Sequence, residues 1–262
     1  MVKLDKVIGD YMQRYFVEKE NIFESNNIAK IIDKENVHHI RDVMRFKNGD
    51  EIVLLCNDLS EYLCVIEDIS SSVTLKILNK KINNNELNVE VDIAHGLVRR
   101  EKKEETLRRL VELGCHKYIP VMMERSIVKM DKYKENNDRI KTIIKECSEQ
   151  SERGMLMEYH DVISFNDLIK SKDNYDYLFV CFEDSGRSNE KALNSYLDKL
   201  NNKKVLVVIG PEGGISDSEL KALKDNGFIA IGLGKRILRT ETAPLYVMSV
   251  LSYMAEVGDY HA

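Results

Sequence analysis

The chain has 262 residues, of which 43% are hydrophobic and 32% are charged, which is the composition of an ordinary globular protein. No apolar run reaches the roughly 18–20 residues of a membrane helix, and the first residues lack the apolar core of a signal peptide, so we expect a cytoplasmic protein. The net charge of −5 means that any binding to nucleic acid must come from local basic patches.

Three short strands are predicted in the first part of the chain, at residues 51–56, 61–67 and 73–78, because turn-forming residues separate three apolar runs. This pattern is typical of a small β-barrel or meander. Residues 79–88 are polar, rich in asparagine and without periodicity, and we interpret them as a linker.

Beyond this segment the pattern changes to strands that alternate with amphipathic helices, which favours an α/β domain with a parallel sheet. Long uninterrupted apolar runs are typical of strands that are buried on both faces of such a sheet. The predicted strands are 89–96, 118–123, 177–182, 204–210 and 228–234, and the predicted helices are 101–114, 132–150 and the segment after Thr242. We therefore divide the chain into a barrel domain over residues 1–80, a linker over 81–88 and an α/β domain over 89–262.

The last three predicted strands each lead into a loop of unusual composition. Residues 183–186 read EDSG, residues 210–219 read GPEGGISDSE, and residues 233–244 read LGKRILRTETAP. In the second loop, Ser216 and Glu219 have the spacing of a capping box that starts a helix. Because ligands of parallel α/β sheets bind outside the carboxyl ends of the strands, we expect the three loops to meet at one site.

The chemistry of these loops restricts the ligand. Glycines let the backbone approach a ligand closely, but no lysine follows Gly213 or Gly214 as a P-loop requires, and no G-x-G-x-x-G fingerprint is present. Glu183 and Glu212 would repel a triphosphate. Glycine backbone with carboxylates suits a cation or a polar neutral group, such as adenosine carrying a sulfonium. One glycine-rich loop alone is more often a tight turn, but three in succession, the last with clustered arginines, favour a binding site.

Metal and disulfide chemistry are not indicated. The five cysteines are widely spaced without a CxxC pair, and the six histidines lack the spacing of metal ligands. We therefore predict no metal site and reduced thiols. His38 and His39 are interpreted as a surface pair or a local RNA contact, and His95 as a strand-end residue without a catalytic role.

Two C-terminal motifs carry a resemblance to a known family. IGPEGGISDSEL followed by LGKRILRTETAP resembles the paired signatures of the bacterial 16S ribosomal RNA uracil-N3 methyltransferases, the RsmE family of the SPOUT superfamily. Further segments match in order along nearly the whole chain, from MQRYFV at residues 12–17 and HHIRDVMRFKNGDEI at 38–52 to the segment EQSER. The sequence departs from the family's usual pattern at Arg109, where lysine is common, and at Met157 and Lys235, where proline is frequent.

The resemblance implies a SPOUT-type trefoil-knotted parallel sheet with helices on both faces, preceded by a PUA-like β-barrel domain that binds RNA. It also implies the cofactor S-adenosyl-L-methionine, held bent and largely by backbone groups of the three loops, and a homodimer formed partly by the last helix. The residues that it places at the cofactor are Glu183, Ile209, Gly210, Pro211, Glu212, Gly213, Gly214, Leu233, Gly234, Ile237, Leu238, Thr242 and Ala243.

The implied reaction assigns roles to the charged residues. Methylation at N3 of uridine removes a weakly acidic proton from the Watson–Crick edge, so the base must be unpaired or flipped into the pocket. Negative charge then spreads onto O2 and O4, where a guanidinium stabilises it. Arg239 is the first candidate for this role and Arg236 the second, because arginine stays protonated and is a poor base. Glu212 or Glu241 is the candidate general base, although an ion pair with Arg239 or a cap on the last helix explains Glu241 equally well.

Basic residues fall into two groups that could position RNA phosphates. The implied partner is 16S ribosomal RNA within the small ribosomal subunit, and the residues proposed to contact it are Arg14, Arg41, Arg45, Lys47, Arg109 and Arg153. The basic segment 99–109 is a second candidate strip beside the one on the first domain.

Two alternatives from other classes stay open on sequence alone. One is a non-catalytic RNA-binding protein of ribosome assembly that keeps the knot as a dimerisation platform, which an intact set of cofactor loops disfavours. The other is a SPOUT enzyme that acts on a different RNA nucleoside.

Overall fold

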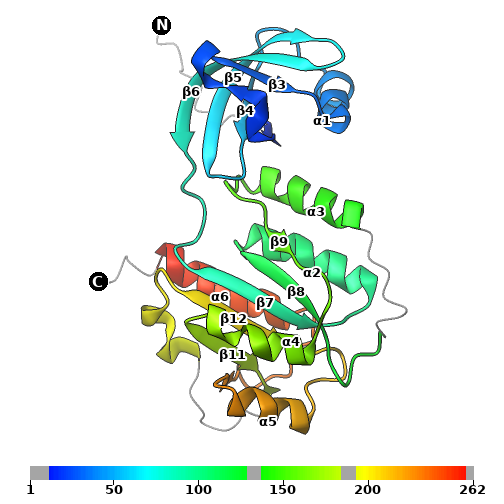
Figure 1. Ribbon diagram of the computed structural model, residues 1–262, viewed down its shortest axis with the longest axis vertical. Helices are drawn as coiled ribbons and strands as arrows, with labels where there is room; N and C mark the ends of the chain where they lie inside the picture. The colour runs from blue at the N-terminus through cyan, green and yellow to red at the C-terminus, as the bar shows by residue number, and fades with distance from the viewer. Residues whose placement is uncertain (1–11, 129–136, 184–192, 258–262) are drawn as a thin grey trace, which may run out of the picture. The chain divides into compact units, whose positions relative to one another are not determined.

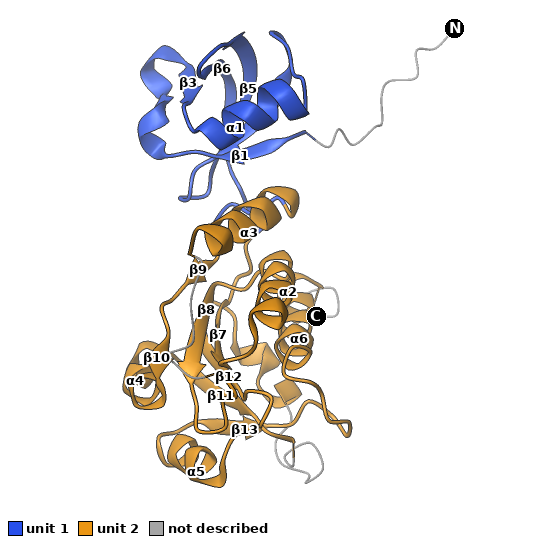
Figure 2. Ribbon diagram, turned by 90° about the vertical axis from the view of Figure 1, so that its right-hand side faces the viewer, with its two compact units in different colours: residues 1–85, 152–155 blue, residues 86–151, 156–262 orange. Residues whose placement is uncertain are grey.

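The computed structural model describes residues 12–128, 137–183 and 193–257. The chain divides into two compact units (Figure 2). Unit 1 comprises Met1–Asn85 with Glu152–Met155, and unit 2 comprises Glu86–Ser151 with Leu156–Ala262. None of the described helices is long and apolar enough to cross a membrane.

Unit 1 is built on a six-stranded sheet in the order β1-β4-β5-β6-β3-β2 (Figure 1). All neighbouring strands are antiparallel except β1 and β4, which run parallel. Its strands are β1 (Arg14–Phe16), β2 (Ile22–Phe23), β3 (Ile28–Ile31), β4 (Glu51–Leu55), β5 (Ser60–Ile69) and β6 (Val73–Ile82), and its α-helix is α1 (Lys34–His38). The three strands predicted between residues 51 and 78 are confirmed as β4, β5 and β6.

One apolar core holds unit 1 together. Alternate residues of the strands point into it, as Ile52 and Leu54 do in β4, and Tyr62 in β5 is fully buried beside them. The predicted linker is wrong over residues 79–82, because β6 continues to Ile82 and pairs with β5 along its whole length. The backbone hydrogen bonds of that pairing outweigh the polar side chains, which the exposed half of the strand presents to solvent.

A short segment far along the chain, Glu152–Met155, completes unit 1; we call it the return segment. Arg14 forms an ion pair with Glu152 at 2.9 Å. The Asn83 amide donates both to the Glu152 carbonyl at 3.1 Å and to the Glu61 carboxylate at 2.9 Å. A Cβ atom at Gly154 would lie 2.9 Å from the Asn83 side chain, so only glycine fits there without displacement.

Unit 2 is an α/β domain around a seven-stranded sheet in the order β10-β8-β7-β12-β11-β13, with β9 paired to β8. Every pairing is parallel. Its strands are β7 (Glu90–Gly96), β8 (Lys117–Met122), β9 (Glu158–Tyr159), β10 (Ile163–Ser164), β11 (Tyr177–Cys181), β12 (Lys204–Ile209) and β13 (Ile229–Ile231). Its α-helices are α2 (Arg100–Glu112), α3 (Asn137–Gln150), α4 (Phe165–Lys170), α5 (Asp217–Asp225) and α6 (Ala243–Val257).

Helices cover both faces of this sheet, as predicted. Along β12, Val205, Val207 and Ile209 share a cluster with α2, α3 and α6, whereas Leu206 and Val208 point to the opposite face and pack with α4 and α5. Figure 2 shows the two layers of helices on either side of the strands. The uninterrupted apolar runs of the sequence therefore arise because the central strands are buried on both faces. The trefoil knot stays a prediction.

The predicted elements of unit 2 are found with shifted ends. The strand predicted over 228–234 is confirmed only as the three residues of β13, and the described part of the helix predicted over 132–150 begins at Asn137; residues 132–136 lie outside the described residues. The predicted capping box is present at the start of α5, where Ser216 and Glu219 exchange their hydrogen bonds. This cap holds the end of the glycine-rich loop against the sheet.

Candidate active site

The loop after β12 is packed so closely at Gly210 and Gly213 that neither position has room for a side chain. A Cβ atom at Gly213 would lie 2.7 Å from the carbonyl oxygen of Arg125, and one at Gly210 would lie 2.9 Å from Ile215. At the end of β7, a Cβ atom at Gly96 would lie 2.5 Å from Pro211. The loop is thus held between β7 and the segment after β8, and glycine is the residue that fits at these contacts.

One hydrogen bond joins the loops after β12 and β13, and two more connect it to β7 and β8. The Thr240 hydroxyl donates to the Gly210 carbonyl at 2.7 Å and lies 2.7 Å from Nε2 of His95. The Nδ1 atom of His95 lies 2.9 Å from the Tyr118 hydroxyl. The prediction that the second and third loops meet is therefore confirmed for these two segments. Burial lowers the pKa of His95 to about 4, although the Glu241 carboxylate acts in the opposite direction.

Two carboxylates and a lysine lie together beside this join. Lys102 on α2 is 3.1 Å from the Glu241 carboxylate and 3.8 Å from that of Glu212. Both carboxylate oxygens of Glu212 are buried and accept no hydrogen bond among the described residues. Burial acts to raise the pKa of Glu241, but a backbone N–H and Lys102 outweigh it, so this pKa lies below its ordinary value.

The cations of the third loop face solvent. Lys235, Arg236 and Arg239 are all exposed, and none of them forms an ion pair within the parts of the chain that the structure describes. The backbone carbonyl of Arg239 accepts hydrogen bonds from the N–H groups of Thr242 and Ala243, which start α6. The Arg239 backbone is therefore fixed while its guanidinium stays available for a ligand.

The remaining residues proposed for the cofactor line these two loops at different depths. Ile209 and Ala243 are buried, Leu233 and Leu238 pack at the edge of the core, and Ile237 is 63% exposed. Gly214 and Gly234 have φ angles of 73° and 111°, which favour glycine. Thr242 is exposed, and its carbonyl accepts the first hydrogen bond of α6 from Tyr246. Glu183 is exposed; residues 184–186 of the first loop lie outside the described residues.

The residues proposed for RNA are divided between the two units. Arg41, Arg45 and Lys47 are exposed and close in sequence in unit 1. Arg14, in the same unit, is half-buried in its ion pair with the return segment, and Arg153 is 4% exposed. In unit 2, Arg109 is exposed and pairs with Glu112 at 3.0 Å. Arg14 is therefore engaged in an ion pair and Arg153 is almost fully buried, so an RNA contact at either residue would compete with the packing of unit 1.

The sequence analysis did not assign four of the residues at this site to it. His95 and Thr240 form the hydrogen-bonded join, Lys102 links the two carboxylates, and Arg125 packs on Gly213. The available signal was positional: His95 is the penultimate residue of a parallel strand, so its side chain lies at the sheet edge where ligands bind.

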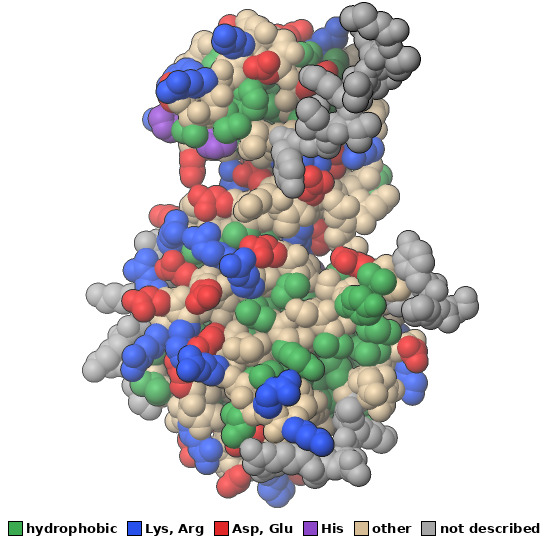
Figure 3. All heavy atoms as spheres, turned by 180° about the vertical axis from the view of Figure 1, so that it is seen from behind, with side chains coloured by type: hydrophobic (Ala, Val, Ile, Leu, Met, Phe, Trp, Pro, Cys, Tyr) green, Lys and Arg blue, Asp and Glu red, His purple; other side chains and the backbone are tan. Residues whose placement is uncertain are grey.

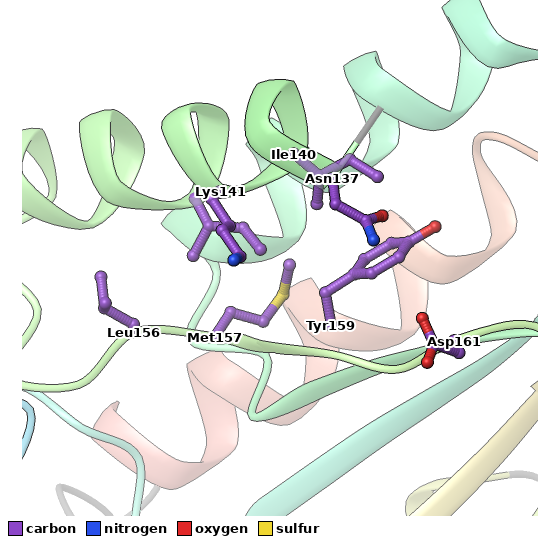
Figure 4. A pocket seen from close by; sticks show the side chains of 8 residues that line it. Asn137, Ile140, Lys141, Leu156, Met157, Tyr159 and Asp161 are labelled. Carbon is purple, nitrogen blue, oxygen red and sulfur yellow. The ribbon is translucent and has the colours of Figure 1, made fainter. Parts of the chain in front are cut away.

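A separate pocket of about 320 Å³ lies in unit 2 between α3 and the segment that contains β9 (Figure 4). Its lining includes Ile140 and Lys141 of α3 and Met157, Tyr159 and Asp161 across from them. None of the residues proposed for the cofactor lines it.

Two family models match the chain. An RNA methyltransferase domain matches residues 85–252, and an RNA methyltransferase PUA domain matches residues 32–78. Among curated relatives, ribosomal RNA small subunit methyltransferase E of Bacillus subtilis is 38% identical over 255 residues, which cover 94% of this chain and 98% of that protein. The protein of the same name from Synechocystis sp. is 28% identical over 93% of this chain and 78% of its own length.

Solved structures agree in fold. A protein from Legionella pneumophila, described as a methyltransferase and solved with the bound cofactor S-adenosylmethionine, has 25% identity and a TM-score of 0.79, covering 92% of this chain and 96% of its own. Ribosomal RNA small subunit methyltransferase E from Neisseria gonorrhoeae, also bound to S-adenosylmethionine, has 24% identity and a TM-score of 0.79, covering 93% and 98%.

Proposed function

This chain belongs to the RNA methyltransferase family of ribosomal RNA small subunit methyltransferase E, and on that premise we propose that it methylates N3 of one uridine in 16S ribosomal RNA. S-adenosyl-L-methionine is the methyl donor. The observation that carries the proposal is the hydrogen bond from Thr240 to Gly210, because it brings the two signature loops together with the exposed arginines beside them.

The donor groups of the site fit this cofactor. The loop after β12, residues 210–219, contains no lysine or arginine for a triphosphate, and we propose that its backbone groups hold the cofactor. The buried oxygens of Glu212 accept no hydrogen bond among the described residues, and a cation or hydroxyl donors of an adenosine would satisfy them. When bound, the cofactor supplies an electrophilic methyl group on a sulfonium; the residues proposed to hold it are those of the three loops.

The side chains then have separate tasks toward the uracil. The base must leave any helix, since N3 lies on its Watson–Crick edge. Arg239 donates hydrogen bonds to the uracil oxygens as N3 loses its proton and charge moves onto them. Lys102 lies nearer to Glu241, at 3.1 Å, than to Glu212, at 3.8 Å, and the pKa of Glu241 is lowered, so Glu212 is the carboxylate that we propose as the proton acceptor. Arg236 is the second candidate for the electrophilic role.

We also infer a homodimer in the cytoplasm that binds the small ribosomal subunit. The buried face of α6 includes Val247, Met248 and Leu251, yet Tyr246 and Tyr253 on the same helix are 42% and 60% exposed. Apolar side chains gather across the face of unit 2 that Figure 3 presents. An apolar helix face of this kind is suited to a second copy of the chain. Sedimentation that finds only monomer at micromolar concentration would contradict the dimer.

Mass spectrometry of 16S ribosomal RNA from cells that lack this protein tests the proposed reaction. We expect the N3-methyluridine signal to disappear and to return when the gene for the intact protein is restored. The purified protein should restore the same mark on isolated small subunits from the deletion strain. A non-catalytic assembly protein predicts an unchanged signal, and an enzyme for another nucleoside predicts loss of a different mark.

Unit 1 is proposed to guide the RNA, which gives a second expected result. Replacing Arg41, Arg45 and Lys47 together with alanine should weaken RNA binding and flatten its salt dependence by about one slope unit for each phosphate contact removed. These side chains are exposed, so the fold should persist. The measurement is RNA binding and methyl transfer at several salt concentrations.

A matched control removes three exposed lysines of unit 2, Lys199, Lys221 and Lys224, and therefore changes the net charge equally. That variant should keep the salt slope of the unaltered protein. If the two triple variants behave alike, the first domain is not the RNA guide, and the basic segment 99–109 becomes the better candidate.

A further inference from the structure

His95 occupies a position that the strand pattern reserves for an apolar residue. Val91 and Ile93 precede it at alternate positions of β7 and lie in the core cluster shared with α2 and α6, and His95 itself has no exposed surface. A buried polar ring is costly unless both nitrogens have partners. Both do, because Tyr118 and Thr240 lie within hydrogen-bonding distance.

One arrangement of protons satisfies the three hydrogen bonds of this network. Since the Thr240 hydroxyl donates its single proton to the Gly210 carbonyl, it must accept from Nε2–H of His95. Nδ1 of the neutral ring then accepts from the Tyr118 hydroxyl. The ring of Tyr118 stands nearly perpendicular to that of His95, at 82°, and is itself stacked on Tyr159. The hydroxyl that orients the imidazole is therefore held in place by ring packing.

A histidine in a protein core often serves packing alone, but this one has a connection beyond packing. Its partner, Thr240, lies between Arg239 and Glu241, and the Thr240 hydroxyl ends on the carbonyl of Gly210. The histidine thus orients the hydroxyl that joins the backbone of one cofactor loop to the segment that carries the electrophilic arginine. The sheet fixes the histidine, since residue 95 is in register with Ile209 at the end of β12.

We propose that His95 is a positioning residue for methyl transfer, which acts through the Thr240 hydroxyl to fix the Arg239–Glu241 segment relative to the Gly210 loop. The inference rests on the proposed function for its effect on the reaction. The tether itself is a property of the unliganded protein. Its loss leaves both loops folded but free to shift, so that the cofactor and the guanidinium no longer meet the uracil in one geometry.

The kinetic test uses four variants in two pairs. Thr240→Val removes the hydrogen bond to Gly210, and His95→Leu removes the donor that orients the Thr240 hydroxyl, both at nearly constant volume. His95→Gln and Thr240→Ser retain an amide donor and a hydroxyl. We expect each apolar variant to lower kcat/KM for methyl transfer about tenfold, the effect of one lost hydrogen bond. The double variant His95→Leu/Thr240→Val should be no slower than either single one, because both break the same chain of hydrogen bonds.

The two conservative variants should stay within about threefold of the unaltered enzyme, although they disturb the core packing as well. A purely structural role predicts instead that activity follows the melting temperature across all four variants, with no rescue. Unchanged kcat/KM in folded His95→Leu, or losses that multiply in the double variant, would overturn the proposal. If His95→Leu does not fold, Thr240→Val and Thr240→Ser give the same comparison from the other end of the tether.

A nuclear magnetic resonance measurement on the unliganded protein separates the tether from the reaction. With ¹⁵N-labelled histidine, the ring of residue 95 should show the Nε2–H tautomer at neutral pH, and the Nε2–H signal should shift in Thr240→Val. A Nδ1–H tautomer would overturn the proposal. If the unaltered protein bound no S-adenosylmethionine, the proposed function would fail, while this measurement would still decide whether the tether exists.

Discussion

Arg239→Ala should lower the rate of methyl transfer by about two orders of magnitude or more, the usual effect of losing one donor to a developing oxyanion. The guanidinium is exposed and unpaired among the described residues, so nothing in the fold depends on it. Its backbone carbonyl, which accepts from the first N–H groups of α6, is unchanged by the substitution. Affinity for S-adenosylmethionine should therefore change much less than the rate.

Single-turnover transfer of a labelled methyl group to isolated small subunits measures the rate, and calorimetry measures the cofactor affinity. Lys235→Ala is the matched control, since it removes one positive charge from the same exposed loop at a residue without a proposed role. Arg239→Lys retains the charge without the planar fork and should recover only part of the rate. Near-normal turnover in Arg239→Ala would make Arg239 structural and transfer the electrophilic role to Arg236.

Gly213→Val should abolish binding of S-adenosylmethionine. The first added carbon would already lie 2.7 Å from the Arg125 carbonyl oxygen and 2.9 Å from the Arg125 Cβ atom, so backbone must move before the valine fits. A shift of the loop displaces the backbone groups that are proposed to hold the cofactor. Calorimetry with S-adenosylmethionine and with its demethylated product measures the effect, and the melting temperature monitors the fold.

Gly213→Ala adds only the first carbon and should weaken binding less than valine does. Gly49→Ala serves as the control for backbone strain, because Gly49 has a φ of 96° with nothing near its absent Cβ, and it lies in unit 1. That variant should lose stability without losing cofactor affinity. Retention of full affinity in Gly213→Val, or binding of ATP or NAD in place of S-adenosylmethionine by the unaltered protein, would refute the assignment of this loop.

The longer elements of unit 2 could be predicted because they have enough residues to show a period. Strands such as β12 (Lys204–Ile209) are continuous apolar runs, and α2 (Arg100–Glu112) repeats its apolar residues with helical spacing. The two-residue strands β2, β9 and β10 are too short to show any period. They exist because neighbouring strands pair with them, which is a property of the tertiary fold.

The candidate site divides in the same way. Its loops could be located from composition, because glycines, carboxylates and arginines seldom occur together directly after buried strands. The pairings within it could not: Lys102 and Glu241 are 139 residues apart in the sequence yet form a hydrogen bond. Nor does sequence distinguish an arginine that faces solvent, such as Arg239, from Arg153, which is 4% exposed. Only the folded chain decides which charges remain available to a substrate.

The return segment has a consequence for how this protein is made. The last strand of unit 1 ends at Ile82, yet Glu152 and Gly154 also belong to this unit. Glu152 pairs with Arg14, and Gly154 packs against Asn83. During synthesis the N-terminal domain must therefore wait, with these contacts open, until a long stretch of unit 2 has left the ribosome. The interval is a window in which a chaperone can bind. It also means that dividing the chain at the apparent linker leaves unit 1 without its return segment. The two units therefore complete their folding together and not one after the other.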